Sequence, residues 1–398
     1  MTSSPAIGGG RTWLSDHGVD LTIKGSMFNQ RVTTGGADPG QWRTGYKGDL
    51  WANIDAKKLV GSWDGLSFQF HFEGRTGEDV NADAGLFTFP NAPLLYPLPG
   101  DYKGVNTTGA TVTQVLFGGK AAVLGGKLNA FDLLNGFFPN IVDSGLSGFL
   151  NANSFLSVTS WGRWLTLSQY GAAAWTLEPK FGAQTGILFT GGANTSTTWA
   201  CGDSWDGGTG ILGFHRFVYE IDGKPGYLFI GAGGSTRNYP ALDPTDWTDF
   251  PGEGAASTDE GKPWEVAIYW YQKVWQAAGD DKRFVQIFMG GSFGDDKVSF
   301  SNWDVFASIQ TFGTFPSRPH DRMGLAGSYY HLSNNFVDLV NIASDGPQLR
   351  DTYWTLELFY NFQVTPWLHW SPDIQYVNNG IKSDDNALII GSRLVVDF

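Results

Sequence analysis

The sequence predicts an all-β fold, a transmembrane antiparallel β-barrel of about 16 strands with long loops folded into the lumen. Short runs of alternating apolar and polar residues recur from residue 18 onward, separated by Gly, Asp, Asn and Pro. The chain has 54 Gly and 17 Trp, yet only 16% of its residues are charged, against roughly 25% in a soluble domain. No stretch reaches the ~18 apolar residues that a membrane-spanning helix needs. Together these observations favour strands that face lipid on one side and water on the other.

The clearest alternating run covers residues 66–75. Successive side chains of a strand point to opposite faces. One face of this run carries Leu66, Phe68, Phe70 and Phe72, and the other carries Ser67, Gln69, His71, Glu73 and Arg75. The pattern repeats over residues 353–362, and tryptophans near strand ends suggest the aromatic girdles of a membrane barrel. These tryptophans are Trp264, Trp270, Trp354, Trp367 and Trp370.

Sixteen such runs divide the chain at a spacing that suits tilted membrane-spanning strands of about ten residues. We expect residues 1–18 to form an N-terminal segment, with a short helix over 11–17, and residues 19–398 to form a single barrel domain. The predicted strands begin near residues 19, 45, 65, 111, 121, 170, 181, 209, 224, 263, 283, 298, 321, 350, 368 and 386.

Three stretches interrupt this rhythm. Residues 76–110 hold Pro90, Pro93, Pro97 and Pro99 in an apolar segment, which indicates a long connection. Residues 131–160 are too apolar to stay in water, so we expect one or both of these stretches to fold into the lumen and narrow it. Residues 238–262 are acidic and Pro-rich, as is typical of an extracellular loop.

Charge and cysteine content exclude several functions. The net charge of −13, without a basic stripe, argues against nucleic acid as a partner. Cys201 is the single cysteine, and Cys/His metal spacing is absent from the sequence, so we expect neither a metal nor any other cofactor. Residues 1–5 lack a charged region followed by an apolar one, so we expect no signal peptide in this chain.

Alternation also predicts which side chains face the lumen on the first three strands. A solute filter needs hydrogen-bonding groups, aromatic faces and charges along a narrowed aqueous path. The substrate-binding candidates are Lys24, Lys47, Asp49, Trp51, His71, Glu73 and Arg75. Our hypothesis is that Arg75 and Lys47 donate to hydroxyls while Glu73 and Asp49 orient them. The alternative is that these charges only solvate the lumen and pair with one another.

Two short motifs resemble catalytic or nucleotide-binding signatures. Residues 290–294 match GxSxG, and residues 208–213 match GxGxxG. Each signature requires a helix after the glycines, but alternating runs follow both, so we interpret both as turns. His71 and Glu73 share a strand face, which we interpret as a lumen pair because a third ligand is lacking. We therefore expect no enzyme activity and no catalytic residues.

The C-terminal region carries the strongest resemblance to a known family. Residues 360–376 (YNFQVTPWLHWSPDIQY) and 391–398 (GSRLVVDF) closely resemble the end of the carbohydrate-selective outer-membrane porins of the OprB type. Residues 45–48, 59–65 and 126–132 are also similar to that family. The resemblance implies a sixteen-stranded porin of a Gram-negative outer membrane that admits monosaccharides or small oligosaccharides by passive diffusion. It also implies that Phe398 is read by the outer-membrane assembly machinery.

Two rival functions stay open from the sequence. One is a porin for other small solutes, such as aromatic acids, which abundant lumenal Arg and Lys without sugar-stacking Trp would favour. The other is a soluble all-β carbohydrate-binding protein or enzyme, for which we would expect a close pair of carboxylates and no need for detergent. As partners we expect sugars and outer-membrane lipid, and the barrel to be a monomer or a homotrimer.

Overall fold

A computed structural model describes residues 8–95, 98, 102–141, 146–157, 164–177, 183–252, 254–343 and 348–398. Residues 1–5, in which we expect no signal peptide, lie outside this part of the chain, and so do Pro97 and Pro99 of the Pro-rich connection. Among the described helices, none is both long and apolar enough to cross a membrane.

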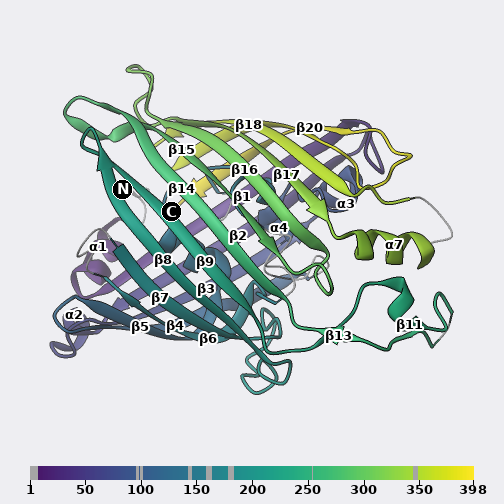
Figure 1. Cartoon of the computed structure of the whole chain (residues 1–398). Coiled ribbons are helices and arrows are strands. Elements are labelled where there is room, and N and C mark those ends of the chain that lie inside the picture. Colours follow the sequence, from purple (N-terminus) through teal and green to yellow (C-terminus); the bar gives the residue numbers. More distant parts are fainter. Residues whose placement is uncertain are drawn as a thin grey trace.

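Sixteen strands close into one antiparallel barrel, in which sequence neighbours pair and β20 returns to pair with β1 (Figure 1). The predicted fold class and strand number are therefore confirmed. The barrel strands are β1 (Val19–Thr34), β2 (Trp42–Asp55), β3 (Leu66–Gly77), β4 (Gly104–Leu116), β5 (Ala121–Asn129), β6 (Ser168–Thr176), β7 (Ala183–Gly191), β8 (Thr209–Ile221), β9 (Lys224–Ser235), β14 (Trp264–Ala277), β15 (Asp280–Gly294), β16 (Ser301–Phe312), β17 (Arg322–Leu332), β18 (Thr352–Thr365), β19 (Leu368–Val377) and β20 (Ala387–Asp397).

Besides the barrel strands, the structure has short helices and two small two-stranded sheets. The helices are α1 (Gly8–Asp16), α2 (Ala56–Val60), α3 (Asn81–Ala84), α4 (Ala92–Leu95), α5 (Ala130–Phe137) and α7 (Asn334–Ala343), with 3₁₀ turns η1 (Ala152–Ser154) and η3 (Pro244–Asp246). The loop after β9 pairs β10 (Tyr239–Pro240) with β13 (Glu260–Gly261), and β11 (Trp247–Thr248) with β12 (Ala256–Ser257).

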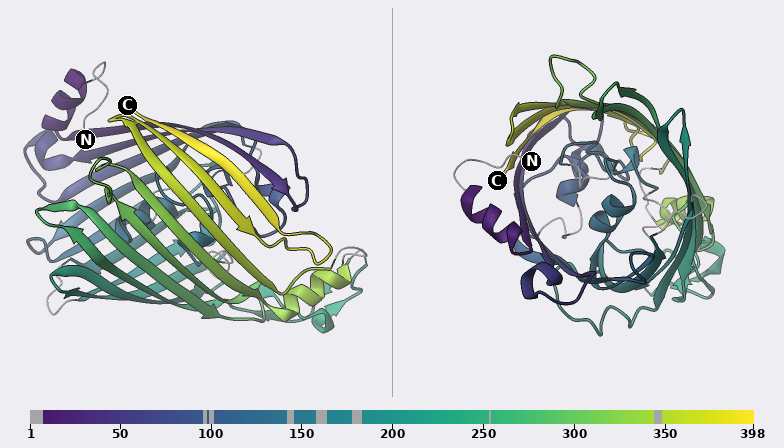
Figure 2. Two further views of the ribbon diagram at one scale, coloured as in Figure 1. Left: turned by 90° about the horizontal axis from the view of Figure 1, so that it is seen from above. Right: turned by 90° about the vertical axis from the view of Figure 1, so that its left-hand side faces the viewer.

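The two ends of the barrel differ. One end, here called the turn end, carries α1, α2, the end of β20 and the shorter connections, whereas α7 and β11 lie at the opposite, long-loop end (Figures 1 and 2). Arg11 links α1 to the start of β1 and to the C-terminus, because its guanidinium donates to the backbone carbonyls of Leu21 and Phe398. In membrane barrels of this class the short turns face the periplasm and the longer loops face outside.

Alternation divides the strands into an apolar outer face and a largely polar inner face. On β18, Leu356 is 49% exposed, whereas its neighbours Thr355 and Glu357 are 2% and 1% exposed. Exposed leucines flanked by buried polar residues are the reverse of a soluble protein's pattern, and they suit a wall that contacts lipid.

Two long loops, L2 (residues 78–103) and L3 (residues 130–167), fold into the lumen in the parts that the structure describes, as predicted. Figure 2, viewed along the barrel from the turn end, shows blue loop segments inside the ring of strands. The Phe138 ring of L3 packs against Phe229, Tyr269 and Phe288 of the inner wall. L2 and L3 also bind each other, because the Ala92 amide donates to the Leu150 carbonyl at 2.9 Å.

Some local predictions were wrong. Residues 290–294 and most of 208–213 lie inside strands β15 and β8 instead of in turns. Glycine is needed in β15 because strands approach closely there: a Cβ on Gly290 would lie 2.2 Å from the Tyr269 ring. The fourth strand begins at Gly104 instead of near residue 111, while the other fifteen begin within three residues of prediction. The apolar stretch predicted to enter the lumen after β5 does so, but it begins with helix α5, which was not predicted.

Candidate functional site

The candidate site lies on the inner face of β2 and β3. Antiparallel register pairs Lys47 with Arg75, Asp49 with Glu73, and Trp51 with His71. Because alternate residues share a face, all six side chains of these three pairs point into the barrel, as the sequence predicts. Trp51 stacks on the His71 ring with 4.3 Å between the ring centroids.

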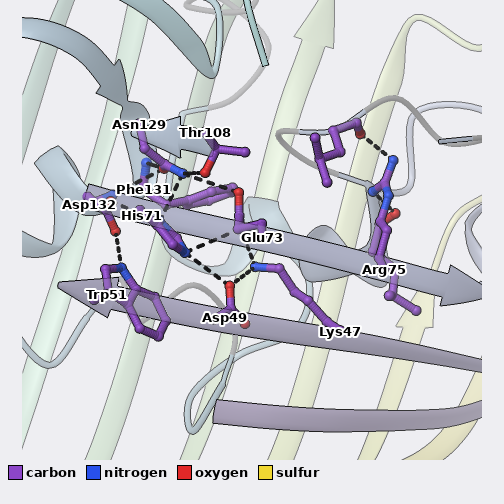
Figure 3. A network of polar contacts seen from close by, with 12 residues as sticks. Lys47, Asp49, Trp51, His71, Glu73, Arg75, Thr108, Asn129, Phe131 and Asp132 are labelled. Carbon is purple, nitrogen blue, oxygen red and sulfur yellow. Dashed lines mark hydrogen bonds and ion pairs between the residues drawn. The ribbon is translucent and has the colours of Figure 1, made fainter. Parts of the chain in front are cut away.

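Four of these residues form one charge network (Figure 3). The Lys47 ammonium lies 2.9 Å from Asp49 Oδ1 and 2.5 Å from Glu73 Oε1. His71 Nε2 lies 3.1 Å from the same Asp49 oxygen. All four side chains are almost fully buried, so their charges are compensated mainly by one another instead of by water.

Helix α5 of L3 is tied to this network. Asp132 accepts a hydrogen bond from Trp51 Nε1 at 3.0 Å, and its other carboxylate oxygen lies 2.9 Å from His71 Nδ1 (Figure 3). Asn129 caps α5 by accepting from the Phe131 amide, and its amide group donates to Glu73 at 3.3 Å. The network therefore fixes the start of L3 against the wall.

The two remaining candidates lie apart from this network. Arg75 holds L2, because its guanidinium donates to the backbone carbonyls of Leu94 and Leu98. Lys24 pairs with Asp397 of β20 at 4.0 Å and keeps 29% of its side chain exposed. The structure thus brings Lys47, Asp49, Trp51, His71 and Glu73 together, assigns Arg75 to a loop contact and leaves Lys24 separate.

L3 is also anchored to β17, β18 and β20, by residues that are not among the predicted candidates. Glu357 of β18 accepts from the Leu150 amide at 2.5 Å and from the Ser154 hydroxyl at 2.6 Å. Arg322 of β17 donates to the Asn140 carbonyl at 2.7 Å, and Arg393 of β20 donates to the Gly148 carbonyl at 2.9 Å. Alternation places all three in the lumen, but it does not show which loop atoms they meet.

Asp49, His71 and Glu73 are also close enough to be considered as metal ligands, since their ligand atoms lie within 4.8 Å of one another. Lys47, however, already contacts both carboxylates with its ammonium group. In the described part of the chain, the Lys47 ammonium thus occupies the position between the two carboxylates that a metal ion would take.

Comparison with known proteins gives consistent results. Residues 41–398 match the family model described as carbohydrate-selective porin, OprB family. The chain is 24% identical to Porin B of Pseudomonas aeruginosa over 98% of this chain and 90% of that protein. Its structure is similar to the high-pH structure of Pseudomonas putida OprB, with a TM-score of 0.83, 22% identity, and coverage of 98% of this chain and 97% of that one. The low-pH structure of the same protein gives a TM-score of 0.60 at 19% identity, with both chains covered completely.

Proposed function

The chain belongs to the OprB family of carbohydrate-selective porins, and from this premise we propose that its lumen passes monosaccharides and small oligosaccharides by passive diffusion. It is a carbohydrate porin of the outer membrane, which confirms the function that the resemblance implied. The family is one of channels instead of enzymes.

The closed barrel with L2 and L3 inside it carries this proposal. Both loops are held by hydrogen bonds to the wall and to each other, so the lumen is narrowed by a fixed structure instead of by loosely tethered chain. A fixed, narrow path lined by polar groups selects solutes by size and hydrogen bonding, and it needs no energy source besides the gradient.

The seven predicted residues enter this proposal with different roles. Lys47, Asp49, His71 and Glu73 set the shape and charge of the wall beside α5, and Arg75 sets the position of L2. Trp51 and Lys24 retain exposed surface in the lumen, so we propose that these two meet passing solute.

Uptake by liposomes tests the solute class. Vesicles that contain the purified protein should swell faster in glucose than in maltose, and faster in either sugar than in a larger oligosaccharide. Rapid uptake of benzoate with no uptake of glucose would instead support the rival channel for aromatic acids.

The same assay tests Arg75. Arg75→Ala should alter glucose uptake because it releases L2; unchanged uptake would remove Arg75 from the site.

We also propose that Phe398 is the signal read by the outer-membrane assembly machinery and that the long-loop end faces outside the cell. The oligomeric state is a monomer or a homotrimer. Light scattering of the detergent-purified protein distinguishes these two, because the protein mass in the trimer is threefold greater.

A further inference from the structure

A cavity of about 360 Å³ lies inside the barrel between α5 and the inner wall of β3 to β9. Its lining includes Trp175 near the end of β6 and Gln184 near the start of β7, so it extends from α5 toward the turn end. The cavity lies next to the charge network, since Asn129 and Asp132 line its edge. Its volume is near the lower limit of small-molecule sites, ~300–1,000 Å³.

One side of this cavity is polar and has free hydrogen-bonding capacity. Gln69 of β3 and Thr111 and Thr113 of β4 line it from neighbouring strands, and all three side chains are half-buried. Within the described part of the chain, these three side chains make no hydrogen bond. They differ in this from Lys47, Asp49, His71 and Glu73, whose polar groups are largely paired with one another.

The other side is apolar and aromatic. Phe137 of α5 lies with its ring centroid 6.2 Å from Trp175 and 4.9 Å from Phe214. Arg216 fixes this end of α5, because its guanidinium donates to the Phe137 carbonyl at 2.8 Å. Trp175 and Phe137 are only half-buried, so parts of their surfaces are available to a ligand.

A sugar has the same division of surfaces, with hydroxyl groups around its edge and C–H groups on its ring faces. Aromatic rings bind apolar surface, while amide and hydroxyl side chains exchange hydrogen bonds with hydroxyls. We propose that this cavity is a sugar subsite on the turn side of L3, in which Trp175 and Phe137 contact the ring face and Gln69, Thr111 and Thr113 bind hydroxyls. The inference rests on the proposed carbohydrate passage. It locates a binding site for the sugar between L3 and the turn end of the barrel.

Block of ion current by sugar tests the subsite. The measurement is the glucose concentration that half-blocks the current through the purified channel in a planar bilayer. Thr111→Val together with Thr113→Val removes two hydroxyls at nearly constant volume, and Trp175→Leu removes the aromatic face. We expect each variant to raise the half-blocking concentration about 3- to 10-fold, the effect of losing one or two hydrogen bonds or a stacking contact. Trp175→Phe should restore most of the binding.

Thr22→Val is the matched control, because Thr22 faces the lumen opposite Trp51 and does not line the cavity. Its half-blocking concentration should equal that of the wild type. Ion conductance in the absence of sugar shows that each variant forms a barrel. If sugar blocks the wild type and all variants equally, the subsite is wrong while the carbohydrate function stands. If sugar never blocks the wild type, the proposed passage and the subsite both fail.

Discussion

His71 on strand β3 and Asp132 on helix α5 lie with Nδ1 and Oδ2 2.9 Å apart, although 61 residues separate them in the sequence. This contact joins the barrel wall to L3, one of the two loops that narrow the lumen. Trp51 donates to the other oxygen of the same carboxylate, so a single aspartate holds the first turn of L3 against two strands.

Replacing Asp132 with Ala should therefore loosen L3. The substitution leaves Trp51 Nε1 and His71 Nδ1 without this acceptor, at a cost of about 1–3 kcal/mol for each group that stays buried and unpaired. We expect single-channel recordings to show a larger and noisier conductance than the wild type. Asp64→Ala is the control, because Asp64 is exposed and, among the described residues, its carboxylate pairs with Lys57 alone, in a turn-end connection. Recordings of Asp132→Ala as quiet as those of the control would contradict this role.

Lys47→Met should destabilise the barrel strongly. It removes the ammonium that compensates Asp49 and Glu73, and breaking a buried ion pair costs about 3–5 kcal/mol. The matched variant Lys57→Met breaks an exposed pair with Asp64, for which roughly 0–1 kcal/mol is expected. Urea unfolding in detergent, followed by tryptophan fluorescence, measures both variants. Equal unfolding midpoints would show that the network does not contribute to stability.

Glu357→Gln should release the far end of L3. One amide oxygen still accepts from the Leu150 amide, but the new NH₂ group cannot accept from Asn151 or Ser154. We expect brief transitions to a higher conductance, and more of them in Glu357→Ala. Glu220→Gln serves as the control, since Glu220 is exposed at the turn end of β8. Stable currents in both Glu357 variants would mean that other contacts suffice to hold L3.

Deleting Phe398 should lower the amount of folded barrel in the outer membrane several-fold. Phe398 is 38% exposed and lies beside β1, where a Cβ on Gly25 would be 3.6 Å away. Its deletion removes two hydrogen bonds at the end of the chain, from Arg11 to its carbonyl and from its amide to the Ile23 carbonyl, and leaves the strand pairing of β20 with β1 in place. Heat-modifiable migration of membrane fractions in gels measures assembly. As a control, the same variant should refold into detergent micelles as well as the wild type does. Normal assembly in cells would contradict the signal role.

The barrel could be predicted from the sequence because period-two alternation is local and repeats in every strand. The start of the fourth strand was the largest error. Residues 104–110, where this strand begins, are mostly small and polar and lack the alternation that begins near residue 111. Alternation along the strands alone also predicted that the side chains of Lys47, Asp49, His71 and Glu73 point into the lumen. The two-residue strands β10 to β13 are too short to leave a periodic signal.

The partners of the lumenal side chains could not be predicted, because loops bring them together. Asp132 contacts His71 only after L3 enters the barrel, and Glu357 meets residues about 200 positions away. A signal for α5 did exist: Asn129 precedes an amphipathic run and caps the helix by accepting from the Phe131 amide. This cap lies outside the alternating strand pattern on which the prediction rested.

The measurement that tests carbohydrate selectivity most directly is the single-channel conductance of the detergent-purified protein in a planar bilayer, with and without added glucose or maltose. A sugar-selective lumen predicts a stable ion conductance that falls in a saturable manner as sugar is added. A conductance that no sugar changes would keep the barrel and contradict the internal sugar site.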